Sequence, residues 1–147
     1  KQDSLDSLQQ SLMRRQIKDH RIHFAGFQET CLKACERTLE ETHLISGGLN
    51  GRLLGCALLI NLDLPYAYVD GKPLKFAKEH FTPIHAAPRL LVCQCKAPYA
   101  TFRIIVAHAP SADASQATKD EWYRVYTKYA SQKGQVLVFI DANAMKS

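Results

Sequence analysis

A succession of short apolar runs in the middle of the chain constrains its fold more than any other feature. Each run has the length of a β-strand, and turn residues separate the runs; Asp70-Gly71 is a frequent hairpin turn. The predicted strands are Leu53 to Ile60, Tyr66 to Val69, Leu74 to Phe76, Leu90 to Lys96 and Thr101 to Ala107. In the fourth run two sets of positions alternate, which predicts a half-exposed strand. So many consecutive strands predict a core built largely from β-sheet.

Helical patterns lie on both sides of this strand-rich segment. Asp3 to about His20 places apolar residues close to helical spacing and predicts an amphipathic helix. A second helix is predicted from about Gln116 to Gln132, and Cys31 to Glu41 is compatible with a short one. Each long helix precedes an apolar run that predicts a buried strand. The two runs are Ile22 to Phe27 and Val136 to Ile140. This alternation predicts an α/β (α+β) fold.

The composition is that of an ordinary soluble domain. Hydrophobic residues make up 46% and charged residues 22% of the 147 residues, which suits one packed domain and argues against disorder. The formal net charge of +5 suits a phosphate-bearing partner. The basic residues are spread along the chain, however, so charge gives only weak support for nucleic-acid binding. The best apolar run has only the length of a strand, so no membrane span is predicted.

The five cysteines predict reduced thiols rather than a disulfide framework. Their number is odd and their spacing matches no framework, which favours an intracellular location, nuclear or cytoplasmic. Cys93 and Cys95 are predicted to be packed thiols on opposite faces of one strand. His80 and His85 lie in a segment predicted to be irregular and have no clear partners. Because a structural zinc site needs four convergent ligands, zinc is not expected.

Polar side chains follow three of the predicted strands at the point where each strand ends. Glu29 follows the first apolar run, His108 follows the last mid-chain strand, and Asp141 and Asn143 follow the final run. If these strands are neighbours, the four side chains meet at one rim. Carboxylate oxygens there bind Mg²⁺ and orient an attacking water, whereas histidine and asparagine can hold phosphate oxygens. The pattern indicates phosphoryl chemistry.

Each candidate also has an ordinary structural interpretation. Taken alone, Glu29 and Asp141 are consistent with solvated carboxylates, and His108 with a hydrogen-bonded structural residue. Trp122 is predicted to pack between helix and sheet rather than to stack on a base. The basic residues that either line a phosphate-backbone path or form a solvated face are Lys72, Lys75, Lys78, Arg89 and Lys96. The recurrence of polar groups at strand ends favours a shared site.

Three short motifs carry a resemblance to a known superfamily. They are Phe27-Gln28-Glu29-Thr30, His108-Ala109-Pro110 and Asp141-Ala142-Asn143. In order and rough spacing they are similar to the motifs of the endonuclease/exonuclease/phosphatase (DNase I-like) superfamily. There, hydrophobic strands end in Gln-Glu, in His-x-Pro or Tyr-x-Pro, and in Gly-Asp-x-Asn. The segment after His108 also resembles the endonuclease domains of retrotransposon-type reverse transcriptases. The resemblance implies a four-layer sandwich, with two mainly antiparallel sheets flanked by helices.

The resemblance further implies hydrolysis of phosphodiester bonds with Mg²⁺, or with Mn²⁺ in its place, and DNA as the favoured substrate. Carried over by position, Glu29 is a metal ligand, and Asp141 is a ligand that orients or activates the water. Asn143 contacts the scissile phosphate, and His108 contacts the phosphate or assists the leaving group. The same scaffold serves phosphatases of phospholipids and nucleotides, so the substrate class stays open, as does the oligomeric state.

The chain departs from the superfamily pattern in three places. It lacks the usual first strand with its asparagine and the terminal Ser-Asp-His segment, and Ile140 stands where glycine is usual. We therefore expect residues 1–147 to be a single incomplete domain of a longer metal-dependent enzyme, with little or no activity of its own. The alternative is a non-catalytic remnant or binding fragment of the same fold.

Overall fold

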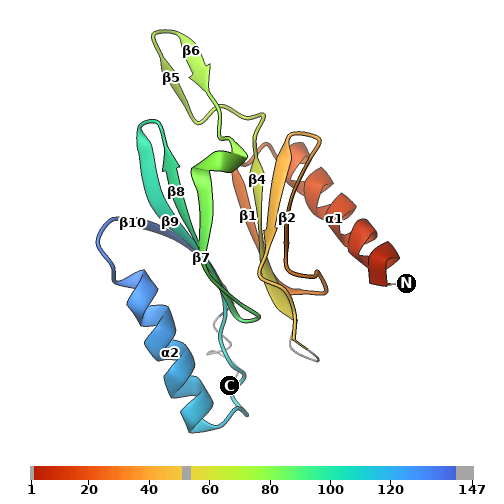
Figure 1. Cartoon of the computed structure of the whole chain (residues 1–147), viewed down its shortest axis with the longest axis vertical. Coiled ribbons are helices and arrows are strands. Elements are labelled where there is room, and N and C mark those ends of the chain that lie inside the picture. Colours follow the sequence, from red (N-terminus) through yellow and green to blue (C-terminus); the bar gives the residue numbers. More distant parts are fainter. Residues whose placement is uncertain (1, 51–53, 142–147) are drawn as a thin grey trace.

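The computed structural model describes residues 2–50 and 54–141. Within these ranges the chain forms two α-helices, one short 3₁₀-helix and ten strands (Figure 1). In chain order they are α1 (Gln2–Asp19), β1 (Phe24–Thr30), β2 (Cys35–Leu39), β3 (Thr42–Ser46), β4 (Gly55–Asn61), β5 (Ala67–Val69), β6 (Lys72–Leu74), η1 (Lys78–His80), β7 (Phe81–Ala87), β8 (Leu90–Ala97), β9 (Ala100–His108), α2 (Gln116–Ala130) and β10 (Gln135–Asp141). The mixed fold class predicted from the sequence is confirmed at this level.

The strands form two four-stranded sheets and a separate hairpin. The first sheet has the order β1-β4-β3-β2, the second has the order β10-β9-β8-β7, and β5 and β6 pair with each other. All pairings are antiparallel except that of β9 with β10, which are parallel and joined through α2. A parallel pair needs such a crossover connection, and a helix usually provides it.

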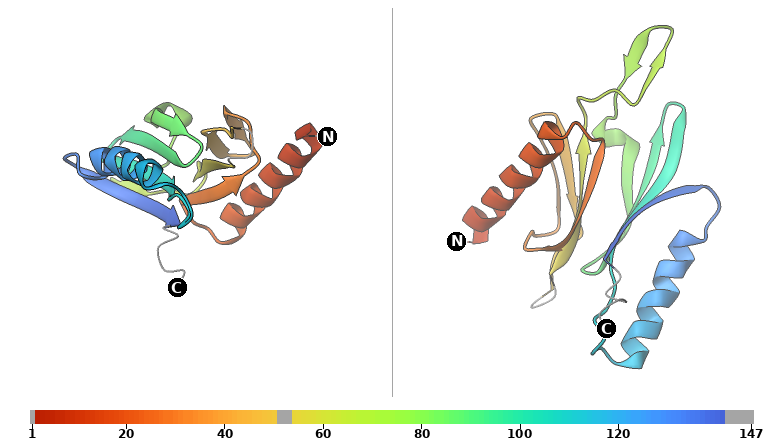
Figure 2. Two further views of the ribbon diagram at one scale, coloured as in Figure 1. Left: turned by 90° about the horizontal axis from the view of Figure 1, so that it is seen from below. Right: turned by 180° about the vertical axis from the view of Figure 1, so that it is seen from behind.

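The two large sheets pack face to face, and one helix covers the outer face of each (Figure 2). Residues such as Leu58 and Ile104 fill the space between the sheets. Met13 and Ile17 of α1 pack on the first sheet, and Trp122 of α2 packs on the second. The order of layers is therefore helix, sheet, sheet, helix. The prediction that Trp122 packs between helix and sheet is confirmed.

The interpretation of residues 31–41 as a short helix is wrong. Residues Cys35–Leu39 instead form strand β2, which pairs with the fully buried strand β3. Glu40 and Glu41 both have positive φ, 54° and 62°, and make the tight turn between the strands. Arg14 of α1 donates hydrogen bonds to Leu39 O and to the Thr42 hydroxyl, and so ties the hairpin to the helix. Pairing and packing override the local helical pattern here.

The strand at residues 136–140 exists, but it is not buried. β10 lies at the edge of its sheet, and Val136, Leu137 and Ile140 are 36%, 39% and 43% exposed. The far edge of the same sheet, β7, carries Pro83 next to a shift in register, a common way to prevent further pairing. β10 shows no such proline or register shift. Its outer edge is thus apolar and open among the described residues.

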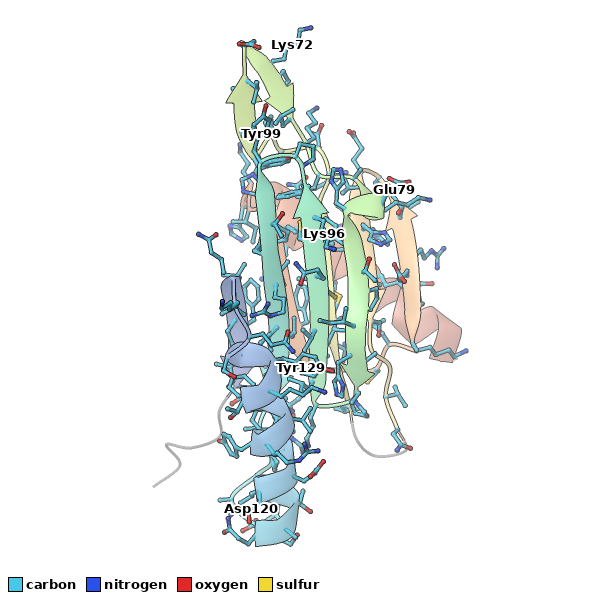
Figure 3. All side chains as sticks on the ribbon, turned by 60° about the vertical axis from the view of Figure 1, so that its left-hand side comes forward. Lys72, Glu79, Lys96, Tyr99, Asp120 and Tyr129 are labelled. Atoms are coloured by element: carbon cyan, nitrogen blue, oxygen red, sulfur yellow. The ribbon has the colours of Figure 1, made fainter. Side chains whose placement is uncertain are left out.

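Strand β8 was predicted to be half-exposed, and this holds only for part of it. Leu90 and Val92 on its outer face are buried under α2, whereas Lys96 lies beyond the helix and is exposed (Figure 3). Cys93 and Cys95 are packed thiols, as predicted, but both face the space between the sheets. Residues two apart in a strand share a face, so the expectation of opposite faces was wrong. Neither described α-helix has the length and hydropathy of a transmembrane segment.

Candidate metal centre

His108 and Asp141 are brought together by the parallel pairing of β9 and β10. The register places these two residues opposite each other at the carboxyl ends of the strands. The backbone N–H of Ala109 donates to Asp141 O at 2.9 Å, which continues the ladder one step beyond β9. Parallel strands present their carboxyl ends at the same edge of a sheet, the usual position of sites in such units. His108 Nε2 lies 3.8 Å from Asp141 Oδ2.

Glu29 reaches the same place from the other sheet. The register of β1 against β4 shifts between Phe27 and Thr30, and within this irregularity Glu29 has a positive φ of 56°. A non-glycine residue in this region is uncommon and costs free energy, and such residues often occur at functional sites. Gly26 allows the approach, because a Cβ at that position would lie 2.6 Å from the Cβ of Phe139 on β10.

Glu29, His108 and Asp141 form a group that could hold a metal ion. One potential ligand atom from each residue lies within 4.8 Å of the others. Glu29 is exposed, the Asp141 side chain is 45% exposed, and His108 is almost buried at 8%. The two carboxylates are therefore accessible to solvent, whereas the imidazole is buried.

Arg89 fixes the orientation of His108. Its Nη1 lies 3.3 Å from His108 Nδ1 and donates to the backbone oxygens of His108 and Ala109 at 3.4 and 3.0 Å. A guanidinium has only donors, so this contact favours the tautomer in which Nδ1 accepts and the neutral ring carries its proton on Nε2. That N–H faces Asp141. In this tautomer His108 is a hydrogen-bond donor rather than a metal ligand.

The remaining donor set fits Mg²⁺ or Mn²⁺. Both ions prefer oxygen ligands, and Mg²⁺ is commonly bound by one or two carboxylates while it keeps several waters. Glu29 and Asp141 supply two solvent-accessible carboxylates. Cys56, Cys93 and Cys95 are buried in the core, away from these carboxylates.

The structure thus brings together three of the four predicted site residues: Glu29, His108 and Asp141. Asn143 lies outside the described residues. His80 and His85 lie on η1 and β7, not in an irregular stretch. Lys72 is on the β5–β6 hairpin, at the end of the sheets away from α2 (Figure 3), and so does not extend this site.

Two residues near the group were not recognised as site residues from the sequence. Gln28 was quoted only as part of a motif, and its side-chain amide contacts both site strands of the second sheet. Arg89 was considered only as a member of a phosphate-backbone path or of a solvated basic face. It also lines a cavity of about 460 Å³ between α2 and the β7–β8 hairpin, with Trp122 and Leu90 among its walls. The sequence feature that could have identified Gln28 as a site residue is its position directly before Glu29.

The chain matches no protein-family model, and no curated protein is significantly similar to it in sequence.

Proposed function

We propose that this chain is part of a Mg²⁺-dependent phosphodiesterase of the endonuclease/exonuclease/phosphatase (DNase I-like) superfamily, with DNA as the favoured substrate. The observation that carries the proposal is the convergence of Glu29, His108 and Asp141 from strands of two sheets. The order of the three motifs in the sequence and the helix-sheet-sheet-helix layering support it. The net charge of +5 agrees with a polyanionic substrate.

Each residue has a distinct role in this proposal. Glu29 and Asp141 hold the ion, and Asp141, the less exposed carboxylate, also orients the water that attacks phosphorus. His108 donates its Nε2–H to a phosphate oxygen, in the tautomer that the contact with Arg89 favours. When bound, the ion neutralises charge on the phosphate. Asn143, two residues after Asp141, is proposed to contact the scissile phosphate.

Metal binding is the first test of this function. Binding of Mn²⁺ to the full chain is measured by electron paramagnetic resonance, for the wild type and for Glu29→Gln and Asp141→Asn. Loss of a carboxylate ligand is expected to weaken binding strongly in both variants. Glu79→Gln is the control, because Glu79 is an acidic residue on η1, away from the group (Figure 3). Equal binding by all four proteins, or none by the wild type, would contradict the proposed centre.

The reaction is tested by nicking of supercoiled plasmid with Mg²⁺ and with EDTA. Nicking that needs Mg²⁺ and is lost in both site variants supports phosphodiester hydrolysis by this chain. Binding of Mn²⁺ without nicking supports the alternative of a non-catalytic piece. Release of phosphate from inositol phosphates or nucleotides, without nicking of DNA, would instead identify a phosphatase.

A further inference from the structure

The metal centre is divided between two sheets, and backbone pairing does not join them. Glu29 belongs to the first sheet, whereas His108 and Asp141 belong to the second. Among the described residues, the backbone of β1 pairs with that of β4, and the backbone of β10 pairs with that of β9. Packing of apolar side chains holds the sheets together, but such contacts have little directional preference. The distance between the two carboxylates therefore needs a more specific restraint.

The side chain of Gln28 supplies a link of this kind. Its Nε2 donates to Ala107 O at 3.3 Å and to Phe139 O at 3.2 Å. Ala107 directly precedes His108, and Phe139 lies two residues before Asp141. Gln28 itself directly precedes Glu29. One amide group thus joins three strands, within one or two residues of each member of the metal centre.

We propose that Gln28 is a positioning residue of the metal centre, whose amide holds the end of β1 against β9 and β10 and thereby sets Glu29 opposite Asp141. The effect that this inference predicts on metal affinity rests on the proposed function. Its geometric part, the restraint on the strand ends, stands on the two hydrogen bonds alone. Residues that orient metal ligands commonly change metal affinity about 10-fold to 100-fold when they are replaced.

The chain offers a closely matched control. Gln94 on β8 also donates through its Nε2 to two backbone oxygens, those of Cys95 at 3.3 Å and Phe102 at 3.1 Å. Gln94 pairs with Arg103, five residues before His108, and so lies about 16 Å along the sheet from the centre. Methionine has nearly the shape of glutamine but no amide donor. Gln28→Met and Gln94→Met therefore remove the same type of contact at and away from the site.

The experiment measures Mn²⁺ affinity by electron paramagnetic resonance, urea unfolding, and hydrogen exchange of the Ala109 amide, which bonds to Asp141 O. Gln28→Met is expected to raise the Kd for Mn²⁺ about 10-fold to 100-fold and to speed exchange at Ala109. Gln94→Met is expected to leave both unchanged. If Gln28→Met does not fold, Gln28→Asn replaces it with the same expectations, because its amide is one methylene too short.

The outcomes separate this inference from the proposed function. Equal Mn²⁺ affinity in Gln28→Met and the wild type overturns the positioning role, while the metal centre stands. Absence of Mn²⁺ binding in the wild type contradicts the metal centre. In that case exchange at Ala109 decides the restraint: faster exchange in Gln28→Met alone supports it, and equal exchange in all three proteins refutes it.

Discussion

Replacing Gly26 by alanine tests whether β1 and β10 approach as closely as the structure indicates. An added Cβ would lie 2.6 Å from both Cβ and Cγ of Phe139, whereas carbon atoms normally rest about 3.5–4.0 Å apart. The strands must therefore separate by about 1 Å. Such overpacking costs about 2–3 kcal/mol, and the loss of glycine's freedom in the unfolded chain offsets about 0.4–1 kcal/mol.

The net expectation for Gly26→Ala is a destabilisation of about 1–2.5 kcal/mol. For a chain of this size that lowers Tm by about 2–10 °C, which calorimetry or circular dichroism resolves readily. Separation of the strands also moves Glu29 away from Asp141, so weaker Mn²⁺ binding is expected in the same variant.

Gly47→Ala is the matched control. Its added Cβ would meet nothing closer than Ala87 O at 3.4 Å, an ordinary contact. Only the effect on the unfolded chain then remains, so Gly47→Ala is expected to raise the free energy of unfolding by about 0.4–1 kcal/mol. The two substitutions thus have opposite signs. A Gly26→Ala protein that melts at or above the wild-type temperature would refute the close contact of β1 with β10.

Three further predictions concern the rest of the molecule. Burial lowers the pKa of His43 below 6.5, so the folded protein prefers the neutral ring and loses stability as pH falls through that value. Urea unfolding at about pH 7.5 and about pH 5.5 should show a larger loss for the wild type than for His43→Asn. Arg103 donates to three carbonyl oxygens at and beyond the end of α2. Arg103→Met should therefore lower the free energy of unfolding by roughly 2 kcal/mol in the same urea assay. An unchanged unfolding midpoint would contradict this. Burial raises the pKa of two core thiols to about 12 and of a third to about 11, so maleimide labelling followed by mass spectrometry should modify them only after unfolding. These thiols are Cys56, Cys93 and Cys95; the half-exposed Cys31 and Cys35 should react in the folded protein.

Local pattern predicted the elements whose stability depends on their own sequence. In α2 the spaced apolar residues form the face that packs on the second sheet. In α1 the match is only partial, because Ile17 is buried against the first sheet whereas Leu8 and Leu12 are exposed. The Asp70-Gly71 turn was predicted correctly, because positive φ at both residues suits this pair, and the structure shows 52° and 77°. In such segments a few neighbouring residues determine the conformation.

Elements that depend on distant partners were missed or misread. Strand β3 (Thr42–Ser46) has no strong pattern of its own and is fixed by β2 and β4 on its two sides. Strand β7 contains Pro83, which normally argues against a strand and is tolerated here because β7 is at an edge. The apolar run of β10 predicted burial, since sequence alone does not tell which strand of a sheet lies outermost.

The candidate site shows the same difference between features that local sequence determines and features that depend on distant contacts. Chemistry and motif order were sufficient to name Glu29, His108 and Asp141, because carboxylates and a histidine recur after strands. The register of β9 with β10 and the bulge that turns Glu29 toward them depend on contacts between residues far apart in the chain. Arg89 and Gln28 make hydrogen bonds to backbone oxygens near the group, and such contacts leave little trace in a sequence.

The edge of β10, open among the residues that the structure describes, has a consequence for handling the protein. An apolar strand with an unpaired edge lets a second molecule add its own strand, and each addition exposes a new edge for the next. Concentrated solutions are therefore expected to become turbid with time, at a rate that rises steeply with concentration. A lysine in place of Leu137, 39% exposed on that strand, should slow this growth. The strand that supplies Asp141 is thus also expected to limit the concentration at which the protein stays in solution.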